Sequence, residues 1–247
     1  IVCQRIPLSM KAIILKTISA AGKCLPRKVR RSSTLQKIKN TINNRLLGHD
    51  GIYNEDYYQH TVEGPAAQSA PVICRSIVNG FRPGSLVDVG CGTGALMEAV
   101  RQAGIRVKGF EYSEAALAFC RKRNLDVTKF DLEKDVLTAG ERFDVAVSME
   151  VAEHLPASVA DKYVDLLTRL SDTVVFTAAP PGQGGQDHVN EQPPEYWIEK
   201  FAGRGLGFDN EVTKSWRDDW QSSGRVAEWY YKNLLVFRKA KATQPVS

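Results

Sequence analysis

The sequence predicts an α/β fold, a doubly wound and mostly parallel sheet with helices on both faces. Short apolar runs bounded by turn residues alternate with helical patterns from Ser85 onward, as expected for successive β-α-β units. The first apolar run leads into a glycine-rich turn, "VDVGCGTGAL" at 87–96, which is typical of ligand-binding sheets of this kind. A late run, "YYKNLLVFRK" at 230–239, predicts a last strand that is antiparallel to its neighbour.

The expected elements follow in a regular order along the chain. A first helix is expected over Ala67–Asn79, ahead of the sheet. Seven strands are expected, at 85–90, 106–111, 126–131, 143–149, 173–179, 208–213 and 230–239. The helices between them are expected at 94–104, 113–123, 157–170 and 194–203. Ser113 is a candidate N-cap, because its hydroxyl can accept from a backbone N–H of the first turn.

The chain has 247 residues and 43% hydrophobic content, which predicts one large domain with an extension. The N-terminal extension is expected at 1–49, partly helical or disordered. A lid segment and the first helix follow at 50–80. The main domain is expected at 81–240, and 241–247 is a C-terminal tail.

The charge is distributed unevenly between the extension and the rest of the chain. Residues 1–49 carry eleven Lys and Arg and no acidic residue, and the remainder carries 22 basic and 28 acidic residues. Two interpretations of this basic arm are open: a solvated extension, or an amphipathic anchor on an anionic membrane. Nucleic acid is the less favoured partner, because the arm has no aromatic residue and the body is acidic.

Cysteine usage indicates the compartment. The five cysteines are odd in number and form no Cys-x-x-Cys pair, which predicts reduced thiols in a cytoplasmic protein. No apolar run approaches the roughly 20 residues that a membrane-spanning helix needs. If the arm binds lipid, the expected location is peripheral, at the inner membrane surface.

The glycine-rich turn is the first candidate site. Gly90, Gly92 and Gly94 permit a tight turn and a close approach of a ligand to the backbone. The helix that follows offers free N–H groups to an anionic ligand group. The same glycines also fit a dinucleotide pattern, so a nicotinamide-dependent oxidoreductase remains an alternative at this point.

Three carboxylates at strand ends argue against the nicotinamide-dependent alternative. Asp88 can hold the loop and receive a ligand ammonium, Glu111 can accept ribose hydroxyls, and Asp131 can meet an adenine amino group. At these residues the chain resembles the class I S-adenosylmethionine-dependent methyltransferases, from roughly Ala67 to Arg238. The resemblance implies a Rossmann-like methyltransferase domain that binds S-adenosyl-L-methionine. The implied cofactor residues are Asp88, Gly90, Cys91, Gly92, Gly94, Glu111, Tyr112, Asp131, Leu132 and Met149.

The segment "SMEVAEHLP" at 148–156 is the second candidate site. Glu150, Glu153 and His154 are spaced i, i+3, i+4, which gathers side chains on one face of a helix. In this fold ligands lie at the carboxyl ends of the strands, so this segment and a later loop with His188 are expected to face the methyl group. Glu153, His154 and His188 are therefore candidate catalytic residues, with either imidazole able to take a proton from a hydroxyl.

A metal-assisted version of the same site is also open. Glu150, Glu153, His154 and His188 offer oxygen and nitrogen ligands that suit Mg²⁺, Mn²⁺, Fe²⁺ or Zn²⁺. The E-x-x-E-H arrangement with a later histidine is similar to the metal site of small-RNA 3′-end 2′-O-methyltransferases, and ubiquinone-pathway O-methyltransferases carry a similar E-x-x-E-H. Metal-free methyltransferases also have a Glu-His pair at this place, so a metal-assisted site and a metal-free acid–base site both remain open.

A substrate region is expected opposite the cofactor. The loop "GQGGQDHVNEQ" at 182–192 offers the hydrogen-bonding side chains Asn190, Glu191 and Gln192. Aromatic residues that can form a wall for a sugar or ring are Tyr53, Tyr57, Tyr58, Trp229 and Tyr230. Together with "SMEVAEHLP", the stretches at 177–197 and 226–237 resemble a bacterial methyltransferase group associated with glycan and natural-product biosynthesis.

These observations predict an O-methyltransferase that acts on a hydroxylated small molecule or glycan. One alternative is an RNA ribose 2′-O-methyltransferase of the small-RNA 3′-end type. A second is a cofactor-binding scaffold without catalysis, which the complete set of three carboxylates disfavours.

Overall fold

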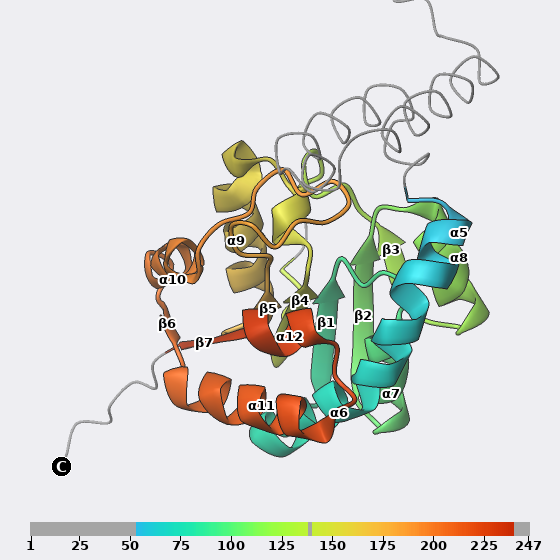
Figure 1. The fold of residues 1–247 in the computed structure, drawn as a ribbon, viewed down its shortest axis with the longest axis horizontal. Coiled ribbons are helices and arrows are strands. Elements are labelled where there is room, and N and C mark those ends of the chain that lie inside the picture. The colour runs from blue at the N-terminus through green and yellow to red at the C-terminus, as the bar shows by residue number, and fades with distance from the viewer. Residues whose placement is uncertain (1–52, 138–139, 240–247) are drawn as a thin grey trace, which may run out of the picture.

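The computed structural model of the chain describes residues 53–137 and 140–239, and the predictions made for 1–49 and 241–247 lie outside them. Its centre is one seven-stranded sheet with the strand order β3-β2-β1-β4-β5-β7-β6 (Figure 1). β1 to β5 pair in parallel, and β7 is antiparallel to both β5 and β6. The predicted fold class is confirmed, including the antiparallel last strand.

The elements have the following bounds. The strands are β1 Ser85–Val89, β2 Arg106–Glu111, β3 Val127–Lys129, β4 Val145–Met149, β5 Thr173–Thr177, β6 Leu206–Phe208 and β7 Leu235–Lys239. The α-helices are α5 Glu55–Tyr57, α6 Glu63–Phe81, α7 Ala95–Gln102, α8 Glu114–Lys122, α9 Ala160–Leu170, α10 Pro194–Ala202, α11 Asn210–Ser223 and α12 Glu228–Asn233. A π-helical turn, η1 Tyr58–Val62, joins α5 to α6, and two 3₁₀ turns follow β4, η2 Ala152–His154 and η3 Ala157–Val159.

Alternation along the strands divides the core between the two faces of the sheet. In β5, Val174 and Phe176 pack on one face with α9 and α10, while Val175 packs on the other with α6, α7 and α11. β7 follows the same rule, with Val236 on the second face. Successive side chains of a strand point to opposite faces, so a run of apolar residues covers both.

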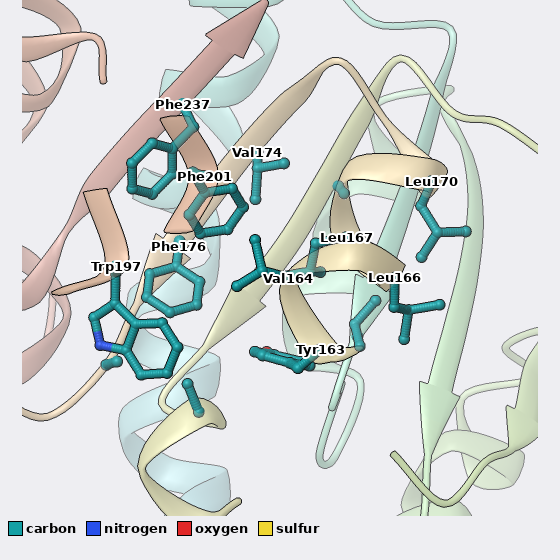
Figure 2. Packing of buried hydrophobic residues seen from close by; sticks show 14 of the residues in the cluster. Tyr163, Val164, Leu166, Leu167, Leu170, Val174, Phe176, Trp197, Phe201 and Phe237 are labelled. Atoms are coloured by element: carbon teal, nitrogen blue, oxygen red, sulfur yellow. The ribbon is translucent and has the colours of Figure 1, made fainter. Parts of the chain in front are cut away.

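The added antiparallel strands are held by an aromatic cluster. Phe176 of β5 lies between Trp197 and Phe201 of α10, and Phe237 of β7 stacks on Phe201 with ring centroids 4.0 Å apart (Figure 2). Trp197 and Phe201 are almost completely buried. This cluster joins the parallel part of the sheet to the edge formed by β7 and β6.

Two predicted strands are partly helices. The strand expected near 208–213 exists and pairs with β7, but its bounds are wrong: β6 ends at Phe208, and α11 begins at Asn210, where the Asp209 side chain accepts from the Val212 N–H as an N-cap. The strand expected at 230–239 begins only at Leu235, and the residues before it form α12.

Smaller differences concern element ends. The first helix is longer than predicted, and α8 begins after Ser113, whose side chain is the N-cap as expected. No helix in the described ranges has both the length and the apolar character needed to cross a membrane.

Candidate active site

A cavity of about 590 Å³ opens at the carboxyl ends of the parallel strands. Its wall is built by the ends of β1, β2 and β4, by η1 and α6, by α12, and by the loop between β5 and α10. Most of the predicted site residues line this cavity: Tyr53, Tyr57, Tyr58, Asp88, Gly90, Cys91, Gly92, Glu111, Tyr112, Asp131, Leu132, Met149, Glu150, Glu153, His154, His188, Trp229 and Tyr230. Gly94 and Asn190 do not line it.

The glycine-rich turn forms the floor at the end of β1. The N–H groups of Gly90 and Cys91 both donate to the Phe110 carbonyl of β2. Gly90 has φ = 78°, and a Cβ there would lie 2.5 Å from Cγ2 of Val151. Any side chain at this position would therefore be strained and would collide with the segment that follows β4.

Asp88 is buried at the end of β1, close to the turn. Burial, together with the nearby Glu111 carboxylate, raises the pKa of Asp88 to about 7. A cationic ligand group beside Asp88 would relieve both effects, because an opposite charge favours the ionised form.

Glu111 is also buried, but its charge is stabilised by the backbone. Oε2 accepts from the Gly92 N–H at 2.8 Å, and Oε1 accepts from the N–H groups of Tyr112 and Ser113, each at 2.8 Å. Burial still raises its pKa, and these three hydrogen bonds oppose the increase. Glu111 thus stabilises the glycine-rich turn and also lines the cavity, and its carboxylate retains acceptor capacity for a further donor.

Asp131 lies two residues beyond the end of β3. Its Oδ1 accepts from the Glu133 N–H and its Oδ2 pairs with Lys134 at 2.7 Å. The side chain lines the cavity, together with Leu132. The three predicted carboxylates therefore meet at one end of one cavity, which we call the cofactor end.

The helical spacing inferred for the segment after β4 is partly wrong. Glu150 has φ = 56° and lies outside any helix, and only Ala152–His154 form a 3₁₀ turn. The Glu150 side chain is instead held by amides, because Asn233 Nδ2 lies 3.0 Å from Oε1 and Gln183 Nε2 lies 3.2 Å from Oε2. This network could not be predicted from the sequence, since Glu150, Gln183 and Asn233 are far apart along the chain.

Glu153 is fully buried, and neither of its carboxyl oxygens makes a hydrogen bond. Burial and the neighbouring Glu150 carboxylate raise its pKa well above the usual value, although nearby backbone groups oppose the increase. A buried carboxyl group without partners is unfavourable. Such a carboxyl group is typically protonated, or it binds a cation or a ligand.

His154 and His188 complete the group. Ligand atoms of Glu153, His154 and His188 all lie within 4.8 Å of one another, and the two imidazole rings meet edge to face at 5.0 Å. His154 Nδ1 lies 3.1 Å from the Tyr53 hydroxyl. The loop that carries His188 is fixed to this segment, because the N–H groups of Val189 and Asn190 both donate to the Glu153 carbonyl. We call these three residues the Glu-His-His cluster.

Of the predicted aromatic residues, Tyr53 and Tyr57 lie beside the cluster, whereas Tyr58 lies near Glu111 at the cofactor end. Tyr53 and Tyr57 meet edge to face at 5.2 Å, and Tyr53 also contacts the His154 ring. Trp229 and Tyr230 belong to α12, and Trp229 is 39% exposed. Burial raises the pKa of Tyr53 and Tyr230, so both hydroxyls stay protonated.

The substrate contact predicted for Asn190 is not supported by its position. Asn190 is buried and does not line the cavity, and its Oδ1 accepts from Gln192 Nε2. Glu191 is likewise used within the loop, where it accepts from Gly182, Gly184 and His188. Gln183 of the same loop does line the cavity and was not predicted.

The charge of the lining is predominantly negative. Seven acidic residues line the cavity, whereas Lys134 is its one lysine or arginine among the residues that the structure describes. Lys134 lies at the cofactor end, paired with Asp131. The end with the Glu-His-His cluster therefore suits neutral or cationic ligand groups better than anionic ones.

Comparison with known proteins shows similarity over the central part of the chain. Residues 87–170 match the family described as a methyltransferase domain. The chain is 31% identical over 117 residues to a ubiquinone biosynthesis O-methyltransferase of Stutzerimonas stutzeri, a match that covers 45% of this chain and 47% of that protein. It is 28% identical over 120 residues to a magnesium-protoporphyrin O-methyltransferase of Synechocystis, covering 46% and 52%. The chain thus spans about half the length of these relatives.

Solved structures support the same fold. The magnesium protoporphyrin IX methyltransferase of Synechocystis with bound S-adenosylmethionine has a TM-score of 0.57 at 18% identity, covering 81% of this chain and 97% of that one. The plantazolicin methyltransferase BpumL with S-adenosylhomocysteine has a TM-score of 0.58 at 14% identity, covering 91% and 100%. The match of residues 87–170 to a methyltransferase domain agrees with the predicted enzyme class, and the solved structures show that the fold is shared.

Proposed function

We propose that the chain is an O-methyltransferase that binds S-adenosyl-L-methionine at the cofactor end and a hydroxylated small molecule or glycan at the Glu-His-His cluster. The observation that carries the proposal is the single cavity that joins Asp88 and Glu111 to Glu153, His154 and His188. Relatives named as O-methyltransferases support oxygen as the acceptor atom.

The cofactor end fits the chemistry of this cofactor. Asp88 would receive the ammonium of the methionine part, and Glu111 would accept a ribose hydroxyl with its remaining acceptor capacity. Asp131 and Leu132 line the wall where the adenine is expected. The sulfonium methyl would then point toward the carboxyl end of β4, where the cluster lies.

The acceptor end must orient a hydroxyl and take its proton. In-line positioning of the hydroxyl oxygen supplies much of the catalysis for an intrinsically reactive methyl donor. An imidazole of His154 or His188 within hydrogen-bonding reach of the hydroxyl can remove the proton as the carbon–oxygen bond forms and the carbon–sulfur bond of the sulfonium breaks, which releases S-adenosylhomocysteine. Tyr53 orients the His154 ring through Nδ1.

The same residues fit a divalent cation. Glu153 is buried with two unpartnered oxygens, and three ligand atoms converge within 4.8 Å. Glu153, His154 and His188 would hold the ion, whereas Glu150 is occupied by Asn233 and Gln183. When bound, such a cation lowers the pKa of a coordinated hydroxyl and orients it.

A product assay tests the proposal. The protein is incubated with labelled S-adenosylmethionine and with catechol or methyl α-glucoside, and S-adenosylhomocysteine formation is measured. We expect acceptor-dependent turnover that falls by about 10²–10⁴ in His154→Gln and His188→Gln, as for loss of a general base, with cofactor affinity within about twofold of the unchanged protein. Full turnover in both variants would contradict the proposed acceptor site.

Chelation separates the two versions of the mechanism. Loss of activity with EDTA and recovery with Mn²⁺ supports the cation, and unchanged activity supports the histidine base alone.

The RNA alternative predicts methylation of a short RNA 3′ end that weakens steeply with salt. The acidic lining described above argues against that alternative.

The basic arm is proposed to bind an anionic membrane surface. Its eleven basic residues against no acid would attract anionic lipid by roughly 1 kcal/mol per residue near the surface. Co-sedimentation with phosphatidylserine vesicles at low salt, lost on deleting residues 1–49, is the expected result. Equal binding by the shortened chain would contradict it.

A further inference from the structure

The loop between β5 and α10 carries three glycines at 182, 184 and 185 and forms no helix or strand, yet one side chain holds it together. Glu191 Oε2 accepts from the Gly182 N–H at 2.9 Å, and Oε1 accepts from the Gly184 N–H at 2.7 Å. Oε1 also lies 3.0 Å from Nδ1 of His188. The Glu191 carboxylate therefore holds both the Gly182–Gly184 segment of the loop and the His188 imidazole.

These contacts decide which nitrogen of His188 carries a proton. An ionised carboxylate only accepts hydrogen bonds, so Nδ1 of His188 must be the donor to Glu191. In the neutral imidazole, Nε2 is then the unprotonated nitrogen. The carboxylate also accepts from the backbone N–H groups of Gly182 and Gly184, and hydrogen bonds of this kind favour its ionised form.

The opposite edge of the ring is confined by a glycine. A Cβ on Gly185 would lie 2.3 Å from Nε2 and 2.5 Å from Cε1 of His188. The ring lies directly over the bare Cα of Gly185, and both residues line the cavity. The next residues are fixed as well, since Val189 and Asn190 donate to the Glu153 carbonyl.

We propose that Glu191 is the positioning residue of the acceptor end, because it holds His188 in the Nδ1–H tautomer with Nε2 unprotonated. The inference rests on the proposed function for the role of His188. It differs from the substrate contact that the sequence suggested for Glu191, since the carboxylate is turned into its own loop. Glu191 acts through His188 and touches no reacting atom.

Nitrogen-15 NMR of histidine-labelled protein tests the tautomer without any acceptor. The chain has four histidines, and His188 is assigned by comparison with His188→Gln. Spectra are recorded at increasing pH until they no longer change, and the tautomer of the neutral ring is read from that end point. We expect Nδ1 of His188 to carry the proton, and Glu191→Gln to disturb this state while Glu195→Gln, an exposed residue of α10, leaves it unchanged.

Two results would overturn the proposal. One is a proton on Nε2 in the unchanged protein, which decides the matter even if a variant does not fold. The other is an unaltered His188 spectrum in Glu191→Gln. Neither depends on whether methyl transfer occurs, so failure of the proposed function leaves this test intact.

A kinetic double-mutant cycle measures the consequence for turnover with catechol. We expect Glu191→Gln to lower kcat about 10–100-fold, as for loss of an outer partner of a site histidine, with unchanged cofactor affinity. In the His188→Gln background the same change should alter kcat less than about twofold, because residues that act as a unit are not additive. Equal losses in both backgrounds would show that Glu191 acts independently of His188.

Discussion

Two buried carboxylates face the cofactor end, and they differ in how their charge is stabilised. Glu111 accepts three backbone N–H groups, whereas the dominant influences on Asp88 are burial and the Glu111 charge itself. Their positions could be predicted from the sequence, because strand ends next to a glycine-rich turn meet at one edge of the sheet. Their different environments could not, since these depend on three-dimensional burial.

The affinity for S-adenosylhomocysteine should depend on pH through Asp88. Its pKa of about 7 means that the empty site holds a neutral carboxyl in mildly acidic solution. A ligand ammonium needs the ionised form, so the dissociation constant should fall as the pH rises toward about 7, by up to roughly tenfold per unit. Isothermal titration measures this, and Asp88→Asn should bind weakly with no such slope over the same range. A pH-independent affinity in the unchanged protein would contradict the role of Asp88.

The same shift predicts a stability change in the empty protein. The folded-state pKa lies above the ordinary value of 3.8, so the folded chain retains a proton that the unfolded chain has lost. Stability from this group is present at low pH and declines as the pH rises from about 4 to 7. Urea denaturation of Asp88→Asn should show a weaker decline over that window, and an equal decline would assign it to other groups.

Replacing Glu111 by Gln tests the ribose contact. The amide keeps the shape but loses the charge that three N–H groups stabilise, so affinity for S-adenosylhomocysteine should fall by about 1.5–3 kcal/mol, or 10–150-fold. Glu114→Gln is a matched control on the adjacent helix, where the carboxylate is exposed and pairs only with surface basic residues. An unchanged affinity in Glu111→Gln would remove this residue from the cofactor site.

At the scale of elements, the segment after β4 and α12 are joined by amide contacts that hold Glu150 out of the Glu-His-His cluster. Asn233 of α12 also donates to Gln183 Oε1 at 2.9 Å, so β4, the loop and α12 meet at one point. The helical spacing of Glu150 and Glu153 suggested a joint ligand set. Glu150 instead has a left-handed backbone and amide partners, while its carboxylate remains a neighbour of Glu153, and backbone conformation at a single non-glycine residue is not visible in a sequence pattern.

Mn²⁺ binding should distinguish the two carboxylates. Because Glu153 is unpartnered and Glu150 is held by amides, Glu153→Gln should weaken Mn²⁺ binding about 10–100-fold, and Glu150→Gln less than about threefold. Electron paramagnetic resonance of free Mn²⁺ gives both values. Equal losses in the two variants would restore Glu150 to the ligand set.

At the scale of the whole molecule, the parallel sheet supplies the site, and the antiparallel edge stabilises it. The alternating strand and helix pattern was sufficient to predict this architecture, because burial on both faces leaves nearly continuous apolar runs. The pattern failed after β6, where most of the strand predicted at 208–213 belongs to α11, whose buried side is formed by Thr213, Trp216 and Trp220. A run as short as 208–213 does not by itself distinguish a strand from a helix.

The aromatic cluster at this edge should be a large contributor to stability. Phe201→Ala removes a fully buried ring stacked on Phe237, and it should lower the free energy of unfolding by about 3–5 kcal/mol. Val136→Ala, at a side chain that is 65% exposed, is the control and should change it by less than about 0.5 kcal/mol. Urea denaturation compares the two, and similar small effects would mean that the edge strands contribute little.

The central claim is that one cavity holds the cofactor at one end and the acceptor chemistry at the other. Calorimetric titration of the full chain with S-adenosylhomocysteine tests it most directly, in the unchanged protein, Glu111→Gln and His188→Gln. We predict one binding site per chain, weakened at least tenfold by Glu111→Gln through the lost charged contact and altered less than about twofold by His188→Gln. Absence of binding, or equal weakening by both changes, would contradict the two-ended cavity.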